Sequence, residues 1–451
     1  MAREVLTDYL EAVGSQIRWR RARGPLLREL SDHIDDQAAA LREQGAEEAA
    51  ALAAAVAEMG DPAQVGQALD RLHRPHDRWG IAGAVALLGA AGLVFQFLLA
   101  RAVPSAGDPW YLLLRHGATV LLGLGAMAAL WFGDVTLLLR RRALPGLALA
   151  LLTVLGVLLC LVSPVQSGGR LHLWGLYPLL LLPIPYAALL LGQKGRGPLA
   201  AALCGLLPPL LPLAALMLPS LSAFLVCWAS MLLTLAAAVG MGWFRGKRLP
   251  ALGAALLPSA ALAALALWSV GSSVYISGRL AAFRDPLSDP MGAGWMYLRL
   301  RAGEALTPHL QNSADLLLAN LRQLLGPWVL PVLAAALVLA ALLTLRRVLT
   351  LSSRAGRLTA LAALLPLLLQ GVLYWLFNLG WSPVGALSLP FLSSGGGFLL
   401  TGGIQRGVVL SVLRMDDLIR DPAETRRSRG EGGLSLSLLG GRLRMEYRPR
   451  T

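Results

Sequence analysis

The sequence predicts an all-α, polytopic membrane protein of about ten transmembrane helices with a small N-terminal cytoplasmic helical domain. Of its 451 residues, 56% are hydrophobic and only 15% are charged, whereas a soluble domain carries about 25% charged residues. The charges are also uneven, because residues 1–78 hold ten arginines and fourteen acids while residues 79–414 hold only six acids. Apolar runs of about 20 residues, long enough to cross a bilayer as helices, recur through 79–414. These observations exclude a soluble enzyme.

The segment 1–78 reads as a cytoplasmic domain of helices. Apolar residues recur there at helical spacing, and they predict helices over 4–20, 25–44 and 46–57, with a last helix ending near His73. Asp61 followed by Pro62 indicates the start of that last helix, because aspartate caps the first amides and proline suits the first turn.

Ten apolar segments follow the N-terminal domain. The predicted spans are 80–102, 112–133, 144–163, 173–193, 198–217, 220–243, 251–273, 326–345, 358–379 and 391–413. The fifth and sixth divide least clearly, because four prolines between 208 and 219 interrupt one long apolar region. Basic residues follow every second span, which is the positive-inside pattern, so both termini are expected in the cytoplasm.

Two segments after residue 79 are not predicted to span the membrane. One lies between spans of the membrane body 79–414, and the other follows it. The connection 274–325 is expected as a large loop on the outer face. The tail 415–451 is expected in the cytoplasm, where alternating residues around Gly440 and Gly441 predict a β-hairpin. The formal net charge of +14 comes from arginines between spans rather than from a basic stripe, so nucleic acid is not an expected partner.

The three cysteines, Cys160, Cys204 and Cys227, all lie inside apolar runs without paired spacing. We therefore expect buried apolar side chains at these positions, rather than disulfides or a zinc site.

The outer loop holds the residues best suited to chemistry. Ionisable side chains at membrane depth are costly, and segment 274–325 concentrates such residues immediately above the apolar body. Within it, Asp315 occurs where a polar stretch becomes an apolar helix. An acid at that point suits either a helix cap, favoured by the helix dipole, or a catalytic role, and the residue types alone favour the cap.

Three motifs carry a resemblance to a known family. Residues 378–396 read NLGWSPVGALSLPFLSSGG, residues 279–295 read RLAAFRDPLSDPMGAGW, and residues 313–316 read SADL. With ten spans and a large outer loop before the eighth, they resemble the SEDS family of FtsW-, RodA- and SpoVE-type proteins over about 80–414. The N-terminal domain resembles the HAAS-type permease-prefix domain, in residues 29–33 (ELSDH) and 59–62 (MGDP).

The resemblance implies a peptidoglycan glycosyltransferase of the cell membrane, serving cell division, cell shape or sporulation. Its implied substrate is lipid II, polymerised at the outer face, and its implied partner is a class B penicillin-binding protein transpeptidase. By matched position, Asp315 would be the catalytic base, or would hold a divalent cation near the pyrophosphate, and Arg279 would face phosphate. The matched substrate-binding residues are Asp285, Ser393, Gly395 and Gly396.

Some positions depart from the family's motifs. Ser313 and Ala314 stand where the family has His and Thr, and Tyr374 falls where an Asn is expected. The interval from Trp295 to Asp315 also lacks the family's glycine-rich stretch with a lysine. Two alternatives therefore stay open: a noncatalytic membrane scaffold that holds a transpeptidase, or a flippase for lipid-linked oligosaccharides.

Overall fold

The computed structural model describes residues 2–73, 79–102, 108–141, 143–162, 164–167, 170–215, 220–271, 274–292, 294–303, 314–416, 419, 435–438 and 441–444. The chain forms two compact units. One comprises Met1–Asp77 with Arg414–Arg420, and the other comprises Arg78–Leu413 with Asp421–Thr451.

The first unit contains four helices in the predicted part of the chain. They are α1 (Ala2–Gln16), α2 (Arg20–Glu43), α3 (Glu48–Glu58) and α4 (Pro62–Leu72). Asp61 caps α4 as expected, because its Oδ1 accepts a hydrogen bond from the Ala63 amide at 3.2 Å. The buried Asp70 accepts one from the Arg18 amide at 2.8 Å, which ties the α1–α2 connection to α4.

Eight helices of the second unit are long and apolar enough to cross a membrane, counted over the described residues. They are α5 (Trp79–Ala102), α6 (Pro109–Phe132), α8 (Leu144–Val162), α12 (Leu221–Gly240), α13 (Arg248–Gly271), α17 (Val329–Leu349), α18 (Arg354–Asn378) and α19 (Gly396–Arg414). The all-α, polytopic fold class is therefore confirmed.

The fourth and fifth predicted spans are shorter apolar helices. The fourth is broken into α9 (Leu176–Leu179) and α10 (Pro183–Leu191), and the fifth is α11 (Pro198–Ala215). The break coincides with Pro183, which supplies no amide to continue a helix from α9. The Leu180 carbonyl at the break accepts a hydrogen bond from Gln405 of α19 at 2.9 Å, so α19 supplies the polar partner that lipid would not.

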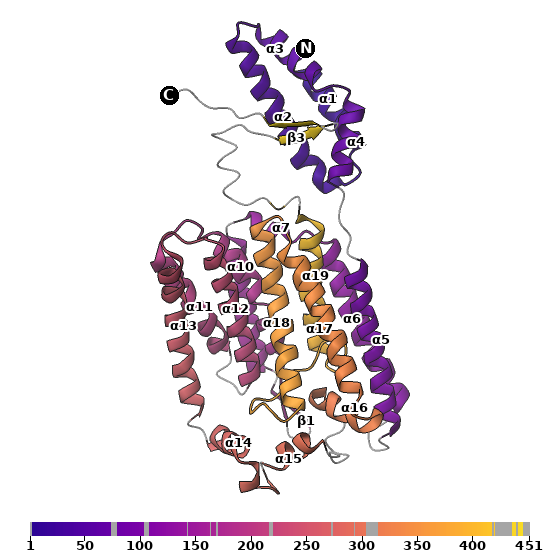
Figure 1. The fold of residues 1–451 in the computed structure, drawn as a ribbon, viewed down its shortest axis with the longest axis vertical. Coiled ribbons are helices and arrows are strands. Elements are labelled where there is room, and N and C mark those ends of the chain that lie inside the picture. Colours follow the sequence, from indigo (N-terminus) through magenta and orange to yellow (C-terminus); the bar gives the residue numbers. More distant parts are fainter. Residues whose placement is uncertain are drawn as a thin grey trace. The chain divides into compact units, whose positions relative to one another are not determined.

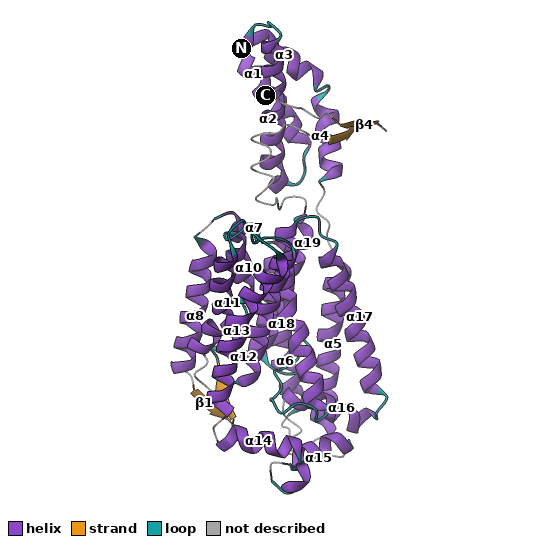
Figure 2. Ribbon diagram, turned by 60° about the vertical axis from the view of Figure 1, so that its left-hand side comes forward, coloured by secondary structure: helices purple, strands orange, loops and turns teal. Residues whose placement is uncertain are grey.

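Short elements occupy the ends of the bundle. At one end lie α14 (Val274–Arg284), the 3-10 turn η2 (Pro286–Ser288), α15 (Trp295–Ala302), the 3-10 turn η4 (Ala314–Leu316) and α16 (Leu317–Leu325). At the opposite end lies α7 (Thr136–Arg140), as Figures 1 and 2 both show. Two antiparallel hairpins complete the chain. The pair β1 (Pro164–Ser167) and β2 (Arg170–Leu173) was not predicted, and β3 (Ser435–Leu438) pairs with β4 (Gly441–Arg444) in the tail.

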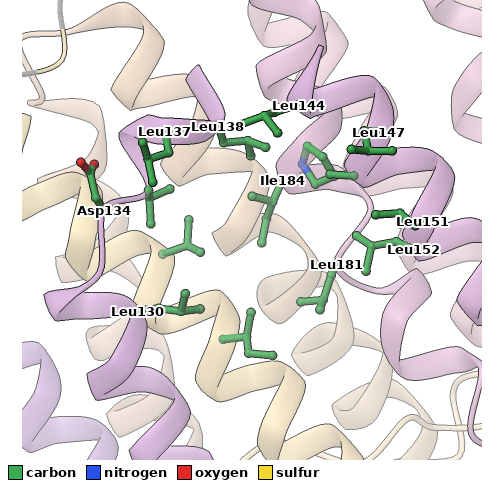
Figure 3. Close-up of a pocket in the computed structure, with 15 residues that line it drawn as sticks. Leu130, Asp134, Leu137, Leu138, Leu144, Leu147, Leu151, Leu152, Leu181 and Ile184 are labelled. Atoms are coloured by element: carbon green, nitrogen blue, oxygen red, sulfur yellow. The ribbon is translucent and has the colours of Figure 1, made fainter. Parts of the chain in front are cut away.

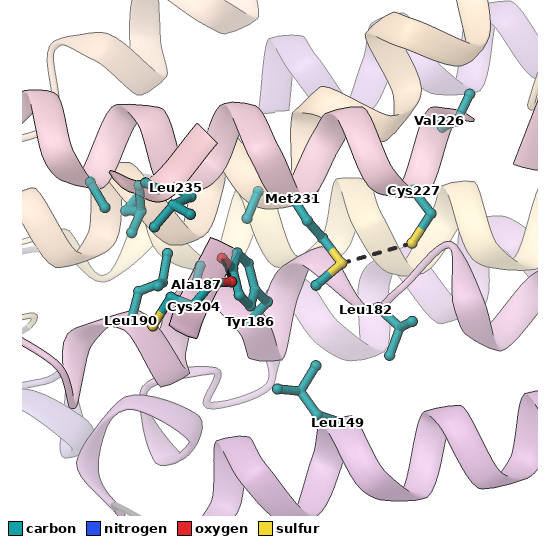
Figure 4. Close-up of a cluster of buried hydrophobic side chains, with 14 of the residues drawn as sticks. Leu149, Leu182, Tyr186, Ala187, Leu190, Cys204, Val226, Cys227, Met231 and Leu235 are labelled. Atoms are coloured by element: carbon teal, nitrogen blue, oxygen red, sulfur yellow. Dashed lines mark hydrogen bonds between the residues drawn. The ribbon is translucent and has the colours of Figure 1, made fainter. Parts of the chain in front are cut away.

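The largest apolar cluster of the bundle joins α8 and α10–α13 to α18. Figure 4 shows its centre, where Tyr186 and Met231 are fully enclosed. The Tyr186 hydroxyl donates to the Cys204 carbonyl at 2.9 Å, so this polar group is satisfied inside the bundle. Cys160, Cys204 and Cys227 are free and buried, which confirms the expected burial of the cysteines.

Candidate functional site

The candidate site is built around the last turn of α18. Asp315 is half-buried in η4, at the start of the segment that leads into α16. Its backbone carbonyl accepts a hydrogen bond from Asn378 Nδ2 at 2.8 Å. A residue 63 positions later in the chain thus fixes the backbone of the predicted catalytic acid.

The first amides of α16 are bonded by side chains of α18. The Leu317 amide donates to the Tyr374 hydroxyl at 3.2 Å, and the Ala319 amide donates to Asn378 Oδ1, also at 3.2 Å. Leu316, not Asp315, occupies the N-cap position. These bonds give hydrogen-bond acceptors to two amides at the start of α16, as a capping side chain would. Helix α16 therefore begins with two of its first amides bonded by α18, and Asp315 lies one residue before its N-cap position.

Ser393 lies in the loop between α18 and α19 and is fully buried. Its Oγ lies 2.7 Å from Ser388 Oγ and accepts a hydrogen bond from the Leu389 amide at 2.8 Å. Ser393 is also a hydrogen-bonding neighbour of Tyr374. Residues 388–393 are thereby closed into a turn that packs against the start of α16.

Gly395 and Gly396 follow this turn at the start of α19, and both are packed closely. A Cβ at Gly395 would lie 2.5 Å from Ser388 Oγ, and one at Gly396 would lie 3.1 Å from Thr119 Cγ2 of α6. A side chain at Gly395 would therefore displace Ser388 within the turn, and one at Gly396 would press against α6. The observed role of both glycines is close packing.

The tip of the same loop is held in an unusual conformation. Phe391 has a φ of 73°, the left-handed region that side chains rarely adopt, and it is fully buried. Its carbonyl packs against Gly92 of α5, where a Cβ would collide with it. The guanidinium of Arg406, within α19, lies 5.1 Å from the centre of the Phe391 ring. These contacts therefore hold Phe391 in a backbone conformation that costs about 1–3 kcal/mol.

Arg279 and Asp285 occupy the neighbouring helix α14 and the turn that follows it. Arg279 is half-buried and Asp285 is exposed. Asp285 Oδ1 accepts a hydrogen bond from the Leu287 amide at 3.2 Å, and Pro286 follows at the first position of η2. The Asp-Pro pair thus starts a turn, and a Cβ at Gly294 would collide with the Pro286 carbonyl of that turn.

Arg301 joins the segment of α14 and α15 to the end of α18. Its Nε donates to the Gly380 carbonyl and its Nη2 to the Phe283 carbonyl, each at 3.0 Å. Its guanidinium also lies 5.0 Å from the centre of the Trp381 ring. A planar fork of donors suits such a three-sided contact. Sequence reasoning missed this residue, since its partners lie 18 and 79 positions away.

The structure brings some of the predicted site residues together and leaves others apart. Tyr374 links Asp315 and Ser393, because it interacts electrostatically with Asp315 and is a hydrogen-bonding neighbour of Ser393. Arg279 belongs to α14, which packs against α13 and η2, whereas η4 packs against α16 and α18. Both groups lie at the same end of the bundle (Figure 2).

The described residues offer no cluster of ligands for a divalent cation. Across the described residues, no three His, Cys, Asp or Glu side chains are grouped so that they could hold a metal ion. The oxygens and hydroxyls around Tyr374 are used in bonds to backbone groups.

No family model matches the chain. Two curated bacterial proteins are similar to it over most of their length, and both are described as "Probable peptidoglycan glycosyltransferase FtsW". The protein of Nitrosococcus halophilus (strain Nc4) is 30% identical over 392 residues, which cover 78% of this chain and 95% of that protein. The protein of Halorhodospira halophila (strain DSM 244 / SL1) is 30% identical over 393 residues, covering 80% and 94%.

One solved structure shares the fold of this chain, and a second is similar to it. A chain from a structure described as "Structural coordination of polymerization and crosslinking by a peptidoglycan synthase complex" superimposes with a TM-score of 0.55 at 22% identity, covering 76% of this chain and 98% of that chain. The rod shape determining protein RodA of Thermus thermophilus covers the same shares at 22% identity, with a TM-score of 0.49.

Proposed function

The chain belongs to the SEDS family of FtsW-, RodA- and SpoVE-type membrane proteins, and on this premise we propose that it is a peptidoglycan glycosyltransferase that polymerises lipid II at the outer face of the membrane. One observation carries the proposal. The similarity to two FtsW proteins extends over 95% and 94% of their lengths and over 78% and 80% of this chain, far beyond one motif.

The reaction joins an acceptor sugar hydroxyl to the anomeric carbon of a lipid-linked donor. A base takes the hydroxyl proton as the new C–O bond forms, and the bond to undecaprenyl pyrophosphate breaks, so that the pyrophosphate leaves with the electron pair. Two protein groups are needed: a base near the acceptor and a cation near the leaving group.

We assign the base to Asp315. Its backbone is fixed by Asn378, and α18 also bonds two of the first amides of α16, so the position of Asp315 is well defined. A half-buried carboxylate at the mouth of the bundle is accessible to an acceptor sugar. A general base contributes about 10²–10⁴ in rate.

We assign the phosphate-facing cation to Arg279. Its guanidinium offers several donors to a pyrophosphate, and α14 is anchored to the end of α18 through Arg301. In this proposal Asp285 shapes the turn beside Arg279. Ser393, Gly395 and Gly396 shape the wall of the substrate site by close packing, rather than by direct chemistry.

A class B penicillin-binding protein is the proposed partner, since the solved relative comes from a peptidoglycan synthase complex described as coordinating polymerization and crosslinking. The least buried span, α17, has only 6% of its central window inside the bundle. Its outward face carries apolar side chains, among them Val332, Leu339 and Leu343, so it is open to a partner helix.

The N-terminal unit is proposed to be a HAAS-type prefix domain on the cytoplasmic side. Its four helices and excess of acids suit a soluble domain that recruits a cytoplasmic partner. Both termini are proposed to be cytoplasmic, from the distribution of arginines between spans.

The test is glycan polymerisation by the purified full-length protein supplied with lipid II, alone and with its transpeptidase. Asp315→Asn should lower the rate by at least about 10²-fold, because the amide cannot accept the proton. The matched control is Asp108→Asn. Asp108 caps α6 by accepting from the Trp110 amide at 3.1 Å, and asparagine caps equally well, so this variant should keep full activity. Equal rates for wild type and Asp315→Asn would remove Asp315 from the mechanism.

A noncatalytic scaffold is the second candidate, and one observation favours it. The polar groups beside Asp315, namely Tyr374, Asn378 and Ser393, all bond to backbone groups of the fold. If wild-type protein polymerises nothing with or without the transpeptidase, yet binds the transpeptidase tightly, the scaffold is the correct function.

A further inference from the structure

We propose that the end of the bundle marked by α7 carries a binding site for one anionic phospholipid, separate from the site of glycan polymerisation. The site is a groove of about 440 Å³ between α6, α7, α8, α10 and α19. Figure 3 shows its lining, which is apolar except for Asp134 at the edge.

The groove has the shape of a slot for an acyl chain. One wall is a single face of α8, formed by Leu144, Leu147, Ala148, Leu151 and Leu152. At the helical rise, Leu144 to Leu152 spans about 12 Å, which is close to the roughly 15 Å hydrocarbon depth of one leaflet. The facing wall includes Ile184 of α10 and Val408 of α19.

The carboxylate of Asp134 belongs to the framework of the groove. Its Oδ1 accepts hydrogen bonds from the Thr136 amide at 3.0 Å and the Thr136 hydroxyl at 2.5 Å. It thereby fixes the start of α7, whose Leu137 and Leu138 line the groove.

Charge at the rim identifies the occupant. Arg141 lies in the connection between two lining residues, Leu138 and Leu144, and its side chain is exposed. An exposed arginine between transmembrane helices, beside an apolar slot, suits an anionic lipid headgroup. This end is opposite to α14–α16, where the proposed polymerisation site lies (Figures 1 and 2). The lipid is therefore a structural ligand rather than the substrate.

The experiment is native mass spectrometry of the purified full-length protein. It is titrated with palmitoyl-oleoyl phosphatidylglycerol and, separately, with palmitoyl-oleoyl phosphatidylcholine. We expect one phosphatidylglycerol to be retained preferentially, and Arg141→Ala to weaken its binding by about fivefold. Leu151→Trp should abolish the retention, because the indole fills the slot.

The matched control is Leu158→Trp, since Leu158 and Leu151 are both exposed leucines of α8, 52% and 59% accessible, but only Leu151 lines the groove. Leu147→Trp provides a second slot-filling variant in case Leu151→Trp lowers the melting temperature. Equal retention of the two lipids by wild type would overturn the proposal. So would unchanged retention in a folded slot-filling variant, or preferential retention of lipid II at this groove.

Discussion

At the scale of single residues, Tyr374 helps to fix the start of α16. It is fully buried, and its hydroxyl accepts the Leu317 amide at 3.2 Å. Its neighbour Asn378 donates to two backbone carbonyls and accepts one amide. Tyr374 and Asn378 thus tie both Asp315 and the start of α16 to α18.

Tyr374→Phe should destabilise the protein by about 1–3 kcal/mol, because a buried amide loses its acceptor. It should also lower polymerisation, since the start of α16 loosens. Tyr297→Phe is the control. Tyr297 is just as buried, and its hydroxyl has no hydrogen-bond partner among the described residues, so its removal should change stability by less than about 0.5 kcal/mol. Thermal unfolding in detergent measures both, and equal shifts would contradict the assigned role of Tyr374.

At the scale of elements, α6 and α19 touch through their backbones. A Cβ at Gly403 would collide with the Gly123 carbonyl, and one at Gly407 would lie 2.7 Å from the Met127 carbonyl. Two glycines four residues apart allow helices to approach closely in a membrane, where packing rather than the hydrophobic effect drives association. The loop tip at Phe391 packs against this contact, since its ring lies 3.2 Å from a Cβ built on Gly123.

Gly403→Ala should therefore force α6 and α19 apart and cost about 1–3 kcal/mol, as overpacking does. The same change at Gly125, on the open side of α6, meets no atom within 4 Å. Gly125→Ala should be neutral or stabilise by up to about 1 kcal/mol, because alanine favours the helix. Thermal unfolding of the two variants checks this. A Gly403→Ala protein as stable as Gly125→Ala would show that the two helices are free to adjust.

At the scale of the whole molecule, aromatic residues mark the membrane interfaces and charge predicts the orientation. Four exposed tryptophans, Trp110, Trp268, Trp328 and Trp381, stand at span ends on the side of α14–α16. Tryptophan is enriched at membrane interfaces, so these residues mark one interface. The arginine-rich connections between spans mark the other, which the positive-inside pattern assigns to the cytoplasm.

Labelling of single cysteines in intact cells tests this orientation. Ser288→Cys, exposed after α14, should react with a membrane-impermeant maleimide, whereas Ser15→Cys, exposed on α1, should react only after the cells are permeabilised. The three native cysteines are buried, so the background should be low. Labelling of Ser15→Cys in intact cells would show that the topology is the reverse of the predicted one. The proposed active site would then lie on the wrong side of the membrane for lipid II.

The sequence by itself determined the membrane body, eight of the spans at full length, the four helices of the N-terminal unit and the family. Hydrophobic length, helical periodicity and motif spacing are properties of contiguous residues, so they can be read without the fold. It also predicted ten full spans, whereas the fourth is split at Pro183 and the fifth is a shorter helix, because proline breaks and packing within a bundle are not visible in average hydropathy.

Only the tertiary structure decided how the candidate site is built. The partners of Asp315, Leu317 and Arg301 lie 63, 57 and 79 positions away in the chain, and the socket for Phe391 combines residues of α5, α6 and α19. Buried hydrogen bonds and close backbone contacts depend on which helices meet. The meeting of helices is a property of the packed bundle and of no single segment.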